Sequence, residues 1–447
     1  MASSSSTLTT GSVYQHLIRL SIPAAMGMVF NTLYNLTDFW FAGLLSDDSL
    51  AGVSIAGSVF FILLAIGIGM QSGTSAVIAP EIGAGNDAGV GGWVDEAFGL
   101  SILFSGIAMM LGWLLANELV LFLGAEPHIA PLANQYLEVT LAGSAAFILS
   151  FMAAGALMAM GDTTSNRNVL MVGFFANFLL NPLFTFVLDF GVRGLALSTV
   201  VIKIASAVYL FRILALKTGR WVKPSFNFSK WLALLQQVLP ASLNMLTVIL
   251  GGFISVAYIG RFGSDHIAGY AVGLRIEQVL LLPALGLNAA VMAIAGQNYG
   301  AGHFDRVRET YSKGLTIGLA MAAVSIPAMV FLSPTMMGIF TQSDVIKLTG
   351  ASYLRIDAIA FYAYVVLFIS VALLQSIKRP LFPMVLGIAR QFIIPASINY
   401  LLIVELGYPM ITIFYTIVSV VVISAFVANW YTRKVLNTFP KTVWTVT

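Results

Sequence analysis

Long apolar stretches recur along the whole chain and are separated by short polar segments. A helix of roughly 20 apolar residues is long enough to cross the hydrocarbon core of a bilayer. The pattern predicts twelve membrane-spanning helices, at residues 19–45, 53–79, 92–116, 130–160, 166–189, 193–217, 234–260, 268–296, 311–333, 349–376, 381–404 and 409–432. Several are longer than a straight crossing requires, which indicates tilted or bent helices. The short segments between them leave no room for a sizeable soluble domain.

Composition supports the same class of protein. Hydrophobic residues make up 59% of the 447 residues and charged residues only 9%, whereas a soluble domain carries about a quarter charged residues. So few charges cannot cover a water-exposed surface, and most of the surface is expected to face lipid. Cysteine is absent, which excludes disulfides and thiolate metal sites. Residues 1–11 lack the basic region of a signal peptide and are expected to form a short polar tail.

Basic residues are distributed unevenly between the predicted loops. The odd-numbered loops contain three, which are Arg193, Arg261 and Lys347. The termini and even-numbered loops contain fourteen, which are Arg19, Arg167, Lys217, Arg220, Lys223, Lys230, Arg306, Arg308, Lys313, Lys378, Arg379, Arg433, Lys434 and Lys441. Because cytoplasmic loops carry the excess of Lys and Arg, we expect both termini in the cytoplasm.

The sequence also matches itself at an offset of 217 residues. Residues 23–55 lie over 240–272 without a gap, and the same offset places the Gly-Ala-Gly of 83–85 over that of 300–302. Each half contains six spans, an even number, so the halves have the same orientation and are parallel repeats related by an axis along the membrane normal. The predicted fold is therefore all-α, with two six-helix bundles in the membrane. Its expected parts are an N-terminal tail (1–18), a first bundle (19–217), a cytoplasmic connector (218–233), a second bundle (234–432) and a C-terminal tail (433–447).

Such a duplication is typical of secondary transporters that work by alternating access. A duplicated membrane protein without a transport role is the alternative. The chain contains no Gly-x-x-x-x-Gly-Lys-[Ser/Thr] loop, which argues against a pump driven by ATP. An enzyme is not expected, because the four histidines lie at the margins of the spans and no nucleophile–base pair lies within them. Those histidines are His16, His128, His266 and His303.

Several motifs together point to a known family. Pro23 in the first span is followed by Asn35-Leu36-Thr37-Asp38, and Gly-Ala-Gly follows spans 2 and 8. In these features the whole chain resembles the MATE (multidrug and toxic compound extrusion) transporters, and most closely their DinF-like branch. The resemblance implies a prokaryotic, proton-coupled drug exporter.

Asp38 is the main candidate for the coupling residue. It lies inside span 1, about two turns from the outer end. A carboxylate at the bilayer centre costs about 2.5–3.5 kcal/mol on insertion scales, and burial disfavours its charged form. We therefore predict that Asp38 binds a proton from one side and releases it when water or a cation arrives. The alternative is a structural acid bonded to a neighbouring hydroxyl or amide. Its repeat partner is Ser255, so the second half lacks this carboxylate.

Four polar residues are expected to form a substrate and proton network with this acid. Tyr34 precedes it by four residues and shares its helix face; its hydroxyl could bond the acid or the substrate, or simply line the cavity. Asn177 and Asn181 share a face of span 5, and the resemblance places them near the acid together with Thr199 of span 6. The amide pair could instead join helices. Some relatives carry Asp at the second position, where this chain has Asn181.

Pro23 is expected to bend span 1, because it removes a backbone hydrogen bond. A static bend is the simple interpretation. The resemblance suggests that protonation of Asp38 changes this bend, so we predict a hinge at Pro23.

The second half carries five charged residues within its spans: Arg275, Glu277, Arg355, Asp357 and Arg390. Three arginines and two carboxylates nearly balance, which favours mutual ion pairing; a second substrate or cation site is the alternative. Arg355 and Asp357 are expected near the outer end of span 10, where they could reach water. Sodium-coupled relatives form a cation site from acids on spans 7 and 10, but here span 7 has no acid.

These observations predict a secondary active exporter of amphiphilic organic cations and drugs, which exchanges protons for substrate. It is expected to work as a monomer in the plasma (inner) membrane, surrounded by lipid and without a nucleic-acid partner. No cofactor or metal is expected, since a proton gradient supplies the energy and sodium fits less well. The alternatives are a lipid-linked oligosaccharide flippase of the same superfamily and a sodium-coupled drug antiporter.

Overall fold

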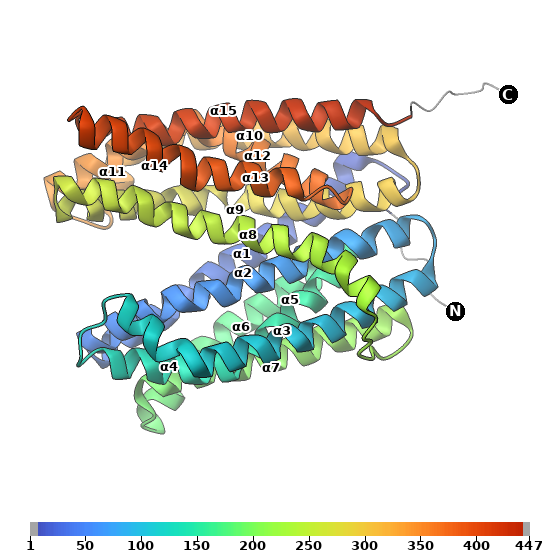
Figure 1. Ribbon diagram of the computed structural model, residues 1–447, viewed down its shortest axis with the longest axis horizontal. Helices are drawn as coiled ribbons and strands as arrows, with labels where there is room; N and C mark the ends of the chain where they lie inside the picture. The colour runs from blue at the N-terminus through green and yellow to red at the C-terminus, as the bar shows by residue number, and fades with distance from the viewer. Residues whose placement is uncertain (1–7, 441–447) are drawn as a thin grey trace. The chain divides into compact units, whose positions relative to one another are not determined.

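The computed structural model describes residues 8–440, apart from the side chain of Ile249 (Figure 1). Every regular element within that range is a helix, and the predicted all-α membrane fold is confirmed. Lys441, one of the basic residues assigned to the cytoplasmic side, lies outside the described residues.

The helices follow the predicted spans closely. The first six spans are α1 (Val13–Leu45), α2 (Asp47–Gly83), α3 (Asp87–Phe122), α4 with α5 (Ala130–Ala142, Ser144–Ala159), α6 with the π-helical turn η1 (Thr164–Pro182, Leu183–Val187) and α7 (Gly191–Thr218). The second six are α8 with η2 (Phe228–Ile259, Gly260–Phe262), α9 (Ser264–Gly300), α10 (Phe304–Gly338), α11 with η3 and α12 (Asp344–Asp357, Ala358–Ala360, Phe361–Ser376), α13 with η4, α14 and η5 (Leu381–Ile388, Ala389–Ile393, Ile394–Asn399, Tyr400–Glu405) and α15 (Ile411–Asn437).

Eleven of the described helical segments are long and apolar enough to cross a membrane. The twelfth candidate is the pair α4 and α5, which is bent by 51°. The break falls at Gly143, where a Cβ atom would lie 2.4 Å from the side chain of Val200 on α7. The predicted continuous span 130–160 is therefore a broken helix that packs closely against α7.

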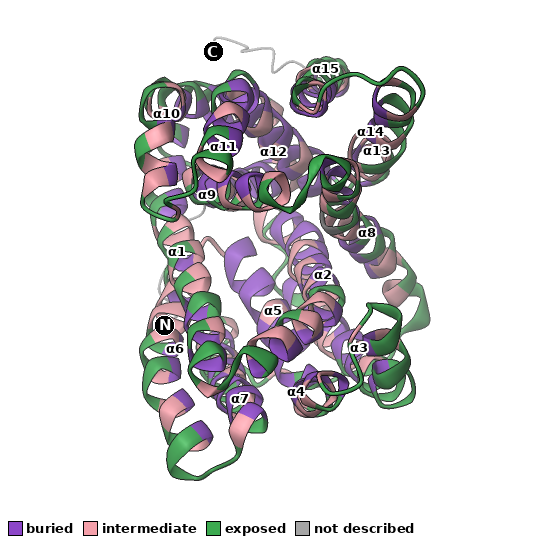
Figure 2. Cartoon of the chain, turned by 90° about the vertical axis from the view of Figure 1, so that its left-hand side faces the viewer, coloured by how far each residue is buried: buried purple, intermediate pink, exposed green. Residues whose placement is uncertain are grey.

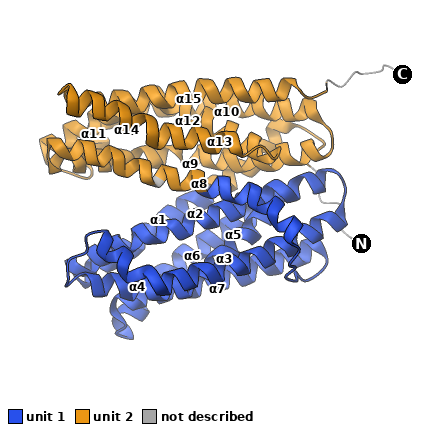
Figure 3. Cartoon of the chain, in the orientation of Figure 1, with its two compact units in different colours: residues 1–7, 26–242 blue, residues 8–25, 243–447 orange. Residues whose placement is uncertain are grey.

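The chain divides into two compact units, which Figure 3 colours separately. Residues 26–242 form the first unit, and residues 8–25 and 243–440 form the second. Both boundaries inside the chain fall within long helices, α1 and α8, within three residues of Pro23 and Pro240. The sequence-based division instead lay in the connector 218–233.

Close contact between α2 and α5 organises the core of the first unit. A Cβ atom on Gly155 would lie 2.2 Å from the carbonyl oxygen of Gln71, so only glycine allows this approach. Small residues bring membrane helices together because packing, rather than water exclusion, drives their association. Nearly all of α5 is buried (Figure 2).

The connector is held on α3 by acidic side chains. Arg220 forms an ion pair of 2.8 Å with Asp95, and the Ser225 hydroxyl donates to the buried carboxylate of Glu96 at 2.7 Å. In the second unit, Arg306 similarly donates to the carbonyl oxygen of Gly11 at 2.9 Å. The segments that lead into α8 and α1 are thus both anchored by charged groups.

Candidate functional site

Asp38 lies on α1 within the first unit, and only 6% of its surface is exposed. Its carboxylate accepts three hydrogen bonds from two other helices. Asn177 and Asn181 of α6 each donate from Nδ2 to Oδ1, at 2.8 and 2.9 Å. Thr199 of α7 donates from its hydroxyl to Oδ2 at 3.3 Å. The structure therefore brings together four residues that the sequence singled out.

The two asparagines are themselves tied together. Asn181 donates to Asn177 Oδ1 at 3.2 Å, and Asn177 donates to Asn181 Oδ1 at 3.4 Å. Ser198 of α7, which sequence reasoning did not select, also donates to Asn181 Oδ1. Asn177, Asn181 and Ser198 are completely buried, and buried amides need such partners because an unpaired polar group costs free energy in an apolar interior.

The local helix geometry around Asn181 is unusual. Pro182 follows it directly, and the helix continues as the π-helical turn η1. Proline cannot donate the backbone hydrogen bond of a regular helix, and single π turns inside helices are frequent at functional sites. The α-helix therefore ends at Pro182, one residue after Asn181, which contacts Asp38.

Gly194 permits α7 to approach this π turn. A Cβ atom at Gly194 would lie 2.7 Å from the carbonyl carbon and oxygen of Phe184, a distance too short for two unbonded atoms. The close approach sets the start of α7 against η1, and it positions Ser198 and Thr199 one turn further along α7 toward the acid.

The hydrogen bonds around Asp38 fit its ionised form. A carboxylate only accepts, whereas a protonated carboxyl group also has a hydrogen to donate. All three partners donate to Asp38 as the structure stands. The Thr199 hydroxyl can reverse its role, because a hydroxyl both donates and accepts. Proton uptake at Oδ2 would therefore require the Thr199 hydroxyl to reorient, while the two amides continue to donate to Oδ1.

Tyr34 lies beside this cluster, with its hydroxyl close to Thr199 and Asn177 but without a hydrogen bond of regular geometry to either. The residue is 6% exposed, and its buried hydroxyl has no hydrogen-bond partner within residues 8–440. It interacts electrostatically with Asp38, as does the buried Tyr136 of α4. An unpaired buried hydroxyl beside a buried acid is suited to binding a ligand or water.

Lys203 is the residue of this site that the sequence reasoning missed. It lies on α7 one turn after Thr199, with its ammonium 5.7 Å from the ring centroids of both Tyr34 and Phe147. The available signal was a lone lysine midway along an apolar span, which by itself suggests a functional position.

Pro23 lies within α1, which is helical through this position from Val13 to Leu45. The structure has a single conformation, so the predicted hinge remains a prediction.

A second acidic cluster is buried in the second unit. The Tyr353 hydroxyl donates to Glu277, and the Tyr364 hydroxyl donates to Asp357 at 3.3 Å. Asp357 is fully buried, and its Oδ2 has no partner in the described part of the chain. Asn399, at the α14–η5 junction, is also buried without a side-chain partner there.

Two expectations about this half were wrong. None of the ion pairs among residues 8–440 joins Arg275, Arg355 or Arg390 to a carboxylate; Glu277 and Asp357 each accept a hydrogen bond from a tyrosine hydroxyl instead. Asp357 also does not reach water at a helix end, since it lies at the 3-10 break within the span 344–376. Arg355 is exposed, and it donates to the carbonyl oxygen of Val330 at 3.3 Å.

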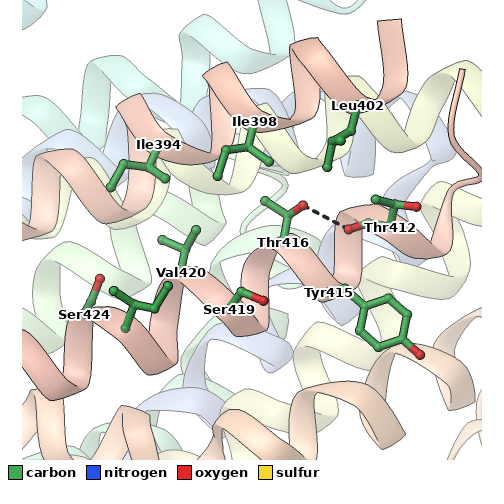
Figure 4. A pocket seen from close by; sticks show the side chains of 10 residues that line it. Ile394, Ile398, Leu402, Thr412, Tyr415, Thr416, Ser419, Val420 and Ser424 are labelled. Carbon is green, nitrogen blue, oxygen red and sulfur yellow. Dashed lines mark hydrogen bonds between the residues drawn. The ribbon is translucent and has the colours of Figure 1, made fainter. Parts of the chain in front are cut away.

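The second unit also has an apolar groove between α14 and α15 (Figure 4). Its volume is about 350 Å³, and Ile394, Ile398 and Thr416 are among its lining residues. The Thr416 hydroxyl donates to the carbonyl oxygen of Thr412, and none of the lining residues carries a charge. This groove is separate from Asp38.

Twelve candidate spans and a buried acid held by neighbouring helices define a multi-span membrane protein of the transporter class. The MatE family model matches residues 23–183 and 240–401. These ranges cover more than half of the chain, which therefore belongs to the MatE family. The starting points of the two matches differ by 217 residues, the offset at which the sequence matches itself. Members of this family are transporters, and the chain is a transporter rather than an enzyme.

Curated relatives cover most of the chain at low identity. An FAD transporter of Shewanella oneidensis is 22% identical, covering 84% of this chain and 84% of its own length. A probable multidrug resistance protein, NorM, of Thermotoga maritima is 25% identical over 74% of this chain and 73% of its own length. The multidrug export protein MepA of Staphylococcus aureus is 23% identical, covering 81% and 82%.

Solved structures share the fold. A MOP superfamily transporter from Pyrococcus furiosus superposes with a TM-score of 0.92 at 24% identity, covering 99% of this chain and 100% of its own. An outward-facing multidrug resistance MATE family transporter gives the same values. At this identity the likeness supports the fold alone.

Proposed function

We propose that this chain is a proton-coupled exporter of amphiphilic organic cations and drugs, which works by alternating access with Asp38 as its protonation and coupling site. The observation that carries the proposal is the buried carboxylate of Asp38, which accepts hydrogen bonds from α6 and α7. Both of these helices and the Asp38 segment of α1 belong to one compact unit.

The proposed exchange rests on competition for one negative group. Ionised Asp38 can bind either a proton or the cationic part of a substrate, and each displaces the other. Protons that enter down their gradient then drive substrate out, with about 2.3 kcal/mol per charge for each 100 mV of membrane potential. One relative, NorM, is named as a probable multidrug resistance protein and another, MepA, as a multidrug export protein, which supports drug-like substrates; one relative is named as an FAD transporter.

We propose the proton as the coupling ion. The helix α8, which forms span 7, has no acidic residue, so it cannot supply a carboxylate to a sodium site shared with span 10. Replacing Na⁺ by choline at fixed pH tests this choice. Efflux that persists in choline supports proton coupling, and efflux that stops in choline contradicts it.

The export function is tested in proteoliposomes that contain the full chain and a fluorescent organic cation. An imposed pH gradient should drive cation movement against its own gradient in the wild-type protein. Asp38→Asn should reduce this movement to the level of empty liposomes. The control is Asp48→Asn, which removes an exposed carboxylate near the start of α2 and should behave like the wild type. Unchanged transport by Asp38→Asn would contradict the proposal.

We further propose that the protein works as a monomer in the plasma membrane, with both termini in the cytoplasm. The uneven distribution of Lys and Arg between its loops supports this orientation.

A further inference from the structure

Lys203 lies in the interior of a membrane span, where a positive charge is costly. It follows Gly191, the first residue of α7, by twelve residues and precedes Thr218, the last, by fifteen. A lysine at the centre of a spanning helix costs about 2.5–3.5 kcal/mol on insertion scales. Such a residue needs a compensating interaction, either within the protein or with a ligand.

The protein provides only part of that compensation. The ammonium of Lys203 is 5.7 Å from the ring centroids of Tyr34 on α1 and Phe147 on α5, which is within the range of cation–π attraction. No ion pair or hydrogen bond joins this ammonium to any of residues 8–440. Its three N–H donors therefore meet aromatic faces and no acceptor in that part of the chain.

A second polar group beside Lys203 also lacks a partner. The hydroxyl of Tyr34 is buried and has no hydrogen-bond partner among the described residues. Tyr34 thus presents its ring to the ammonium and an unpaired hydroxyl to the same cluster. The half-buried ammonium of Lys203 and the buried hydroxyl of Tyr34 can both be satisfied by an acceptor that enters with the substrate.

Asp38 is close enough to interact electrostatically with Lys203, yet the two do not form an ion pair within 4 Å. The titratable groups that face this site are Asp38 and Tyr34 from α1, Tyr136 from α4 and Lys203 itself from α7. The neighbouring α6 contributes the amides of Asn177 and Asn181, and α5 contributes the ring of Phe147.

We propose that Lys203, together with the Tyr34 hydroxyl, binds an acidic group of the substrate, a carboxylate or a phosphate. This inference rests on the proposed export function and narrows its substrate class. Substrates that carry both a cationic part for Asp38 and an acidic part for Lys203 are bound in preference to simple cations. Phe147 and the ring of Tyr34 then contact the apolar body of the substrate.

Because of Asp38 and Lys203, protonation of the site has opposite effects on the binding of cationic and acidic groups. With Asp38 ionised, the pair is neutral overall and a cation binds at Asp38. With Asp38 protonated, the positive charge of Lys203 is no longer balanced, and an anion binds more tightly. A proton therefore competes with the cationic part of a substrate and assists the acidic part.

Matched ligand pairs test this in the purified full-length protein, without a gradient. Rhodamine 110 carries a free carboxylate and rhodamine 123 is its methyl ester, so the pair differs at one acidic group. Riboflavin and riboflavin 5′-phosphate form a second pair, which differs by one phosphate group. Kd is measured by fluorescence anisotropy for the wild type, Lys203→Met, Lys203→Arg and Asp38→Asn.

The wild type should bind the member of each pair that carries the acidic group more tightly than the other member. Lys203→Met should weaken the binding of that acidic ligand by about tenfold or more, as expected for loss of a charge-assisted hydrogen bond. The same variant should bind the cationic ester at least as tightly as the wild type. Lys203→Arg should keep the preference. A preference for one acid type alone identifies that type as the ligand group.

Asp38→Asn tests the interaction of Lys203 with the acidic group while leaving Lys203 unchanged. It should tighten binding of rhodamine 110 relative to its ester, because the competing negative charge is gone. Equal ratios of acid to ester binding in the wild type, Lys203→Met and Asp38→Asn would overturn the proposal. Because these are equilibrium measurements, that result is distinct from a failure of proton-driven export, which the proteoliposome assay reports.

Discussion

Asp38 and the acids of the second unit differ in what surrounds them. Asp38 accepts hydrogen bonds from two amides and a hydroxyl, and the nearby Lys203 adds one positive charge. Glu277 and Asp357 are instead bonded to tyrosine hydroxyls. The first arrangement is suited to reversible binding of a proton and a cation.

Asn181 links the acid to both α6 and α7, so its removal tests the network. Asn181→Leu keeps the branched shape of the side chain but leaves Asp38, Asn177 and Ser198 each without one partner. We expect the free energy of unfolding to fall by about 1–3 kcal/mol and proton-driven transport to be lost. Thermal unfolding and the proteoliposome assay measure the two effects.

The control for this variant is Asn117→Leu, at an exposed position of α3, which removes one exposed hydrogen bond, donated by Asn134, and should unfold near the wild-type temperature. An Asn181→Leu protein with wild-type stability and transport would show that the amide network is dispensable.

Part of the site could be predicted from residue identity and part could not. An acid within an apolar span and an asparagine pair at helical spacing can be recognised in the sequence alone. Lys203 was overlooked because its importance depends on which helices surround it. The expected ion pairing in the second half failed for the same reason, since charge balance along a chain says nothing about which side chains meet.

At the scale of elements, hydrophobic length predicted all twelve spans within several residues of the observed ends. It did not predict the break at Gly143 or the π turn after Pro182. The break at Gly143 is a site of tertiary contact, where the glycine allows α7 to approach. The π turn directly follows Pro182, which cannot donate the backbone hydrogen bond of a regular helix. Apolar periodicity carries no signal for either.

Gly194→Ala tests whether close packing of α7 on η1 positions the site. The new methyl group would meet the Phe184 carbonyl group at 2.7 Å, so α7 must shift away and draw Ser198 and Thr199 from their partners. We expect destabilisation of about 1–3 kcal/mol and weaker binding of organic cations, measured by thermal unfolding and fluorescence anisotropy.

Gly106→Ala on α3 is the matched control. A Cβ atom there meets nothing within 4 Å, and replacing a helical glycine by alanine should be neutral or stabilise by up to about 1 kcal/mol. If both alanine variants behave alike, the close approach at Gly194 does not position the site.

At the scale of the whole molecule, the internal repeat was visible in the sequence, and the MatE model matches it twice. The repeat predicts the scaffold because Pro and Gly positions survive in both halves. It does not predict the chemistry, since Asp38 is aligned with Ser255. Lys203 also has no charged counterpart, because α15, the sixth span of the second half as α7 is of the first, has no charged residue before Arg433. Both proposed charges of the binding site therefore lie in the first half alone.

The orientation in the membrane can be tested with single cysteines, because the natural chain has none. Lys223→Cys lies in the connector and Glu126→Cys lies in the loop before α4, and both positions are exposed. In intact cells, a membrane-impermeant maleimide should label Glu126→Cys only, and Lys223→Cys should react after the cells are opened. The reverse pattern would place the termini outside.

Proton release on substrate binding tests the central claim most directly. The purified protein, in a weakly buffered solution with a pH-sensitive dye, is titrated with an organic cation over a series of pH values. The account predicts release of about one proton per bound cation where Asp38 is protonated, and none at higher pH, where it is already ionised. Asp38→Asn should release no proton, and it should bind the cation more weakly than the wild type in the pH range where Asp38 is ionised. Release by Asp38→Asn equal to that of the wild type would contradict the assignment of Asp38 as the exchange site.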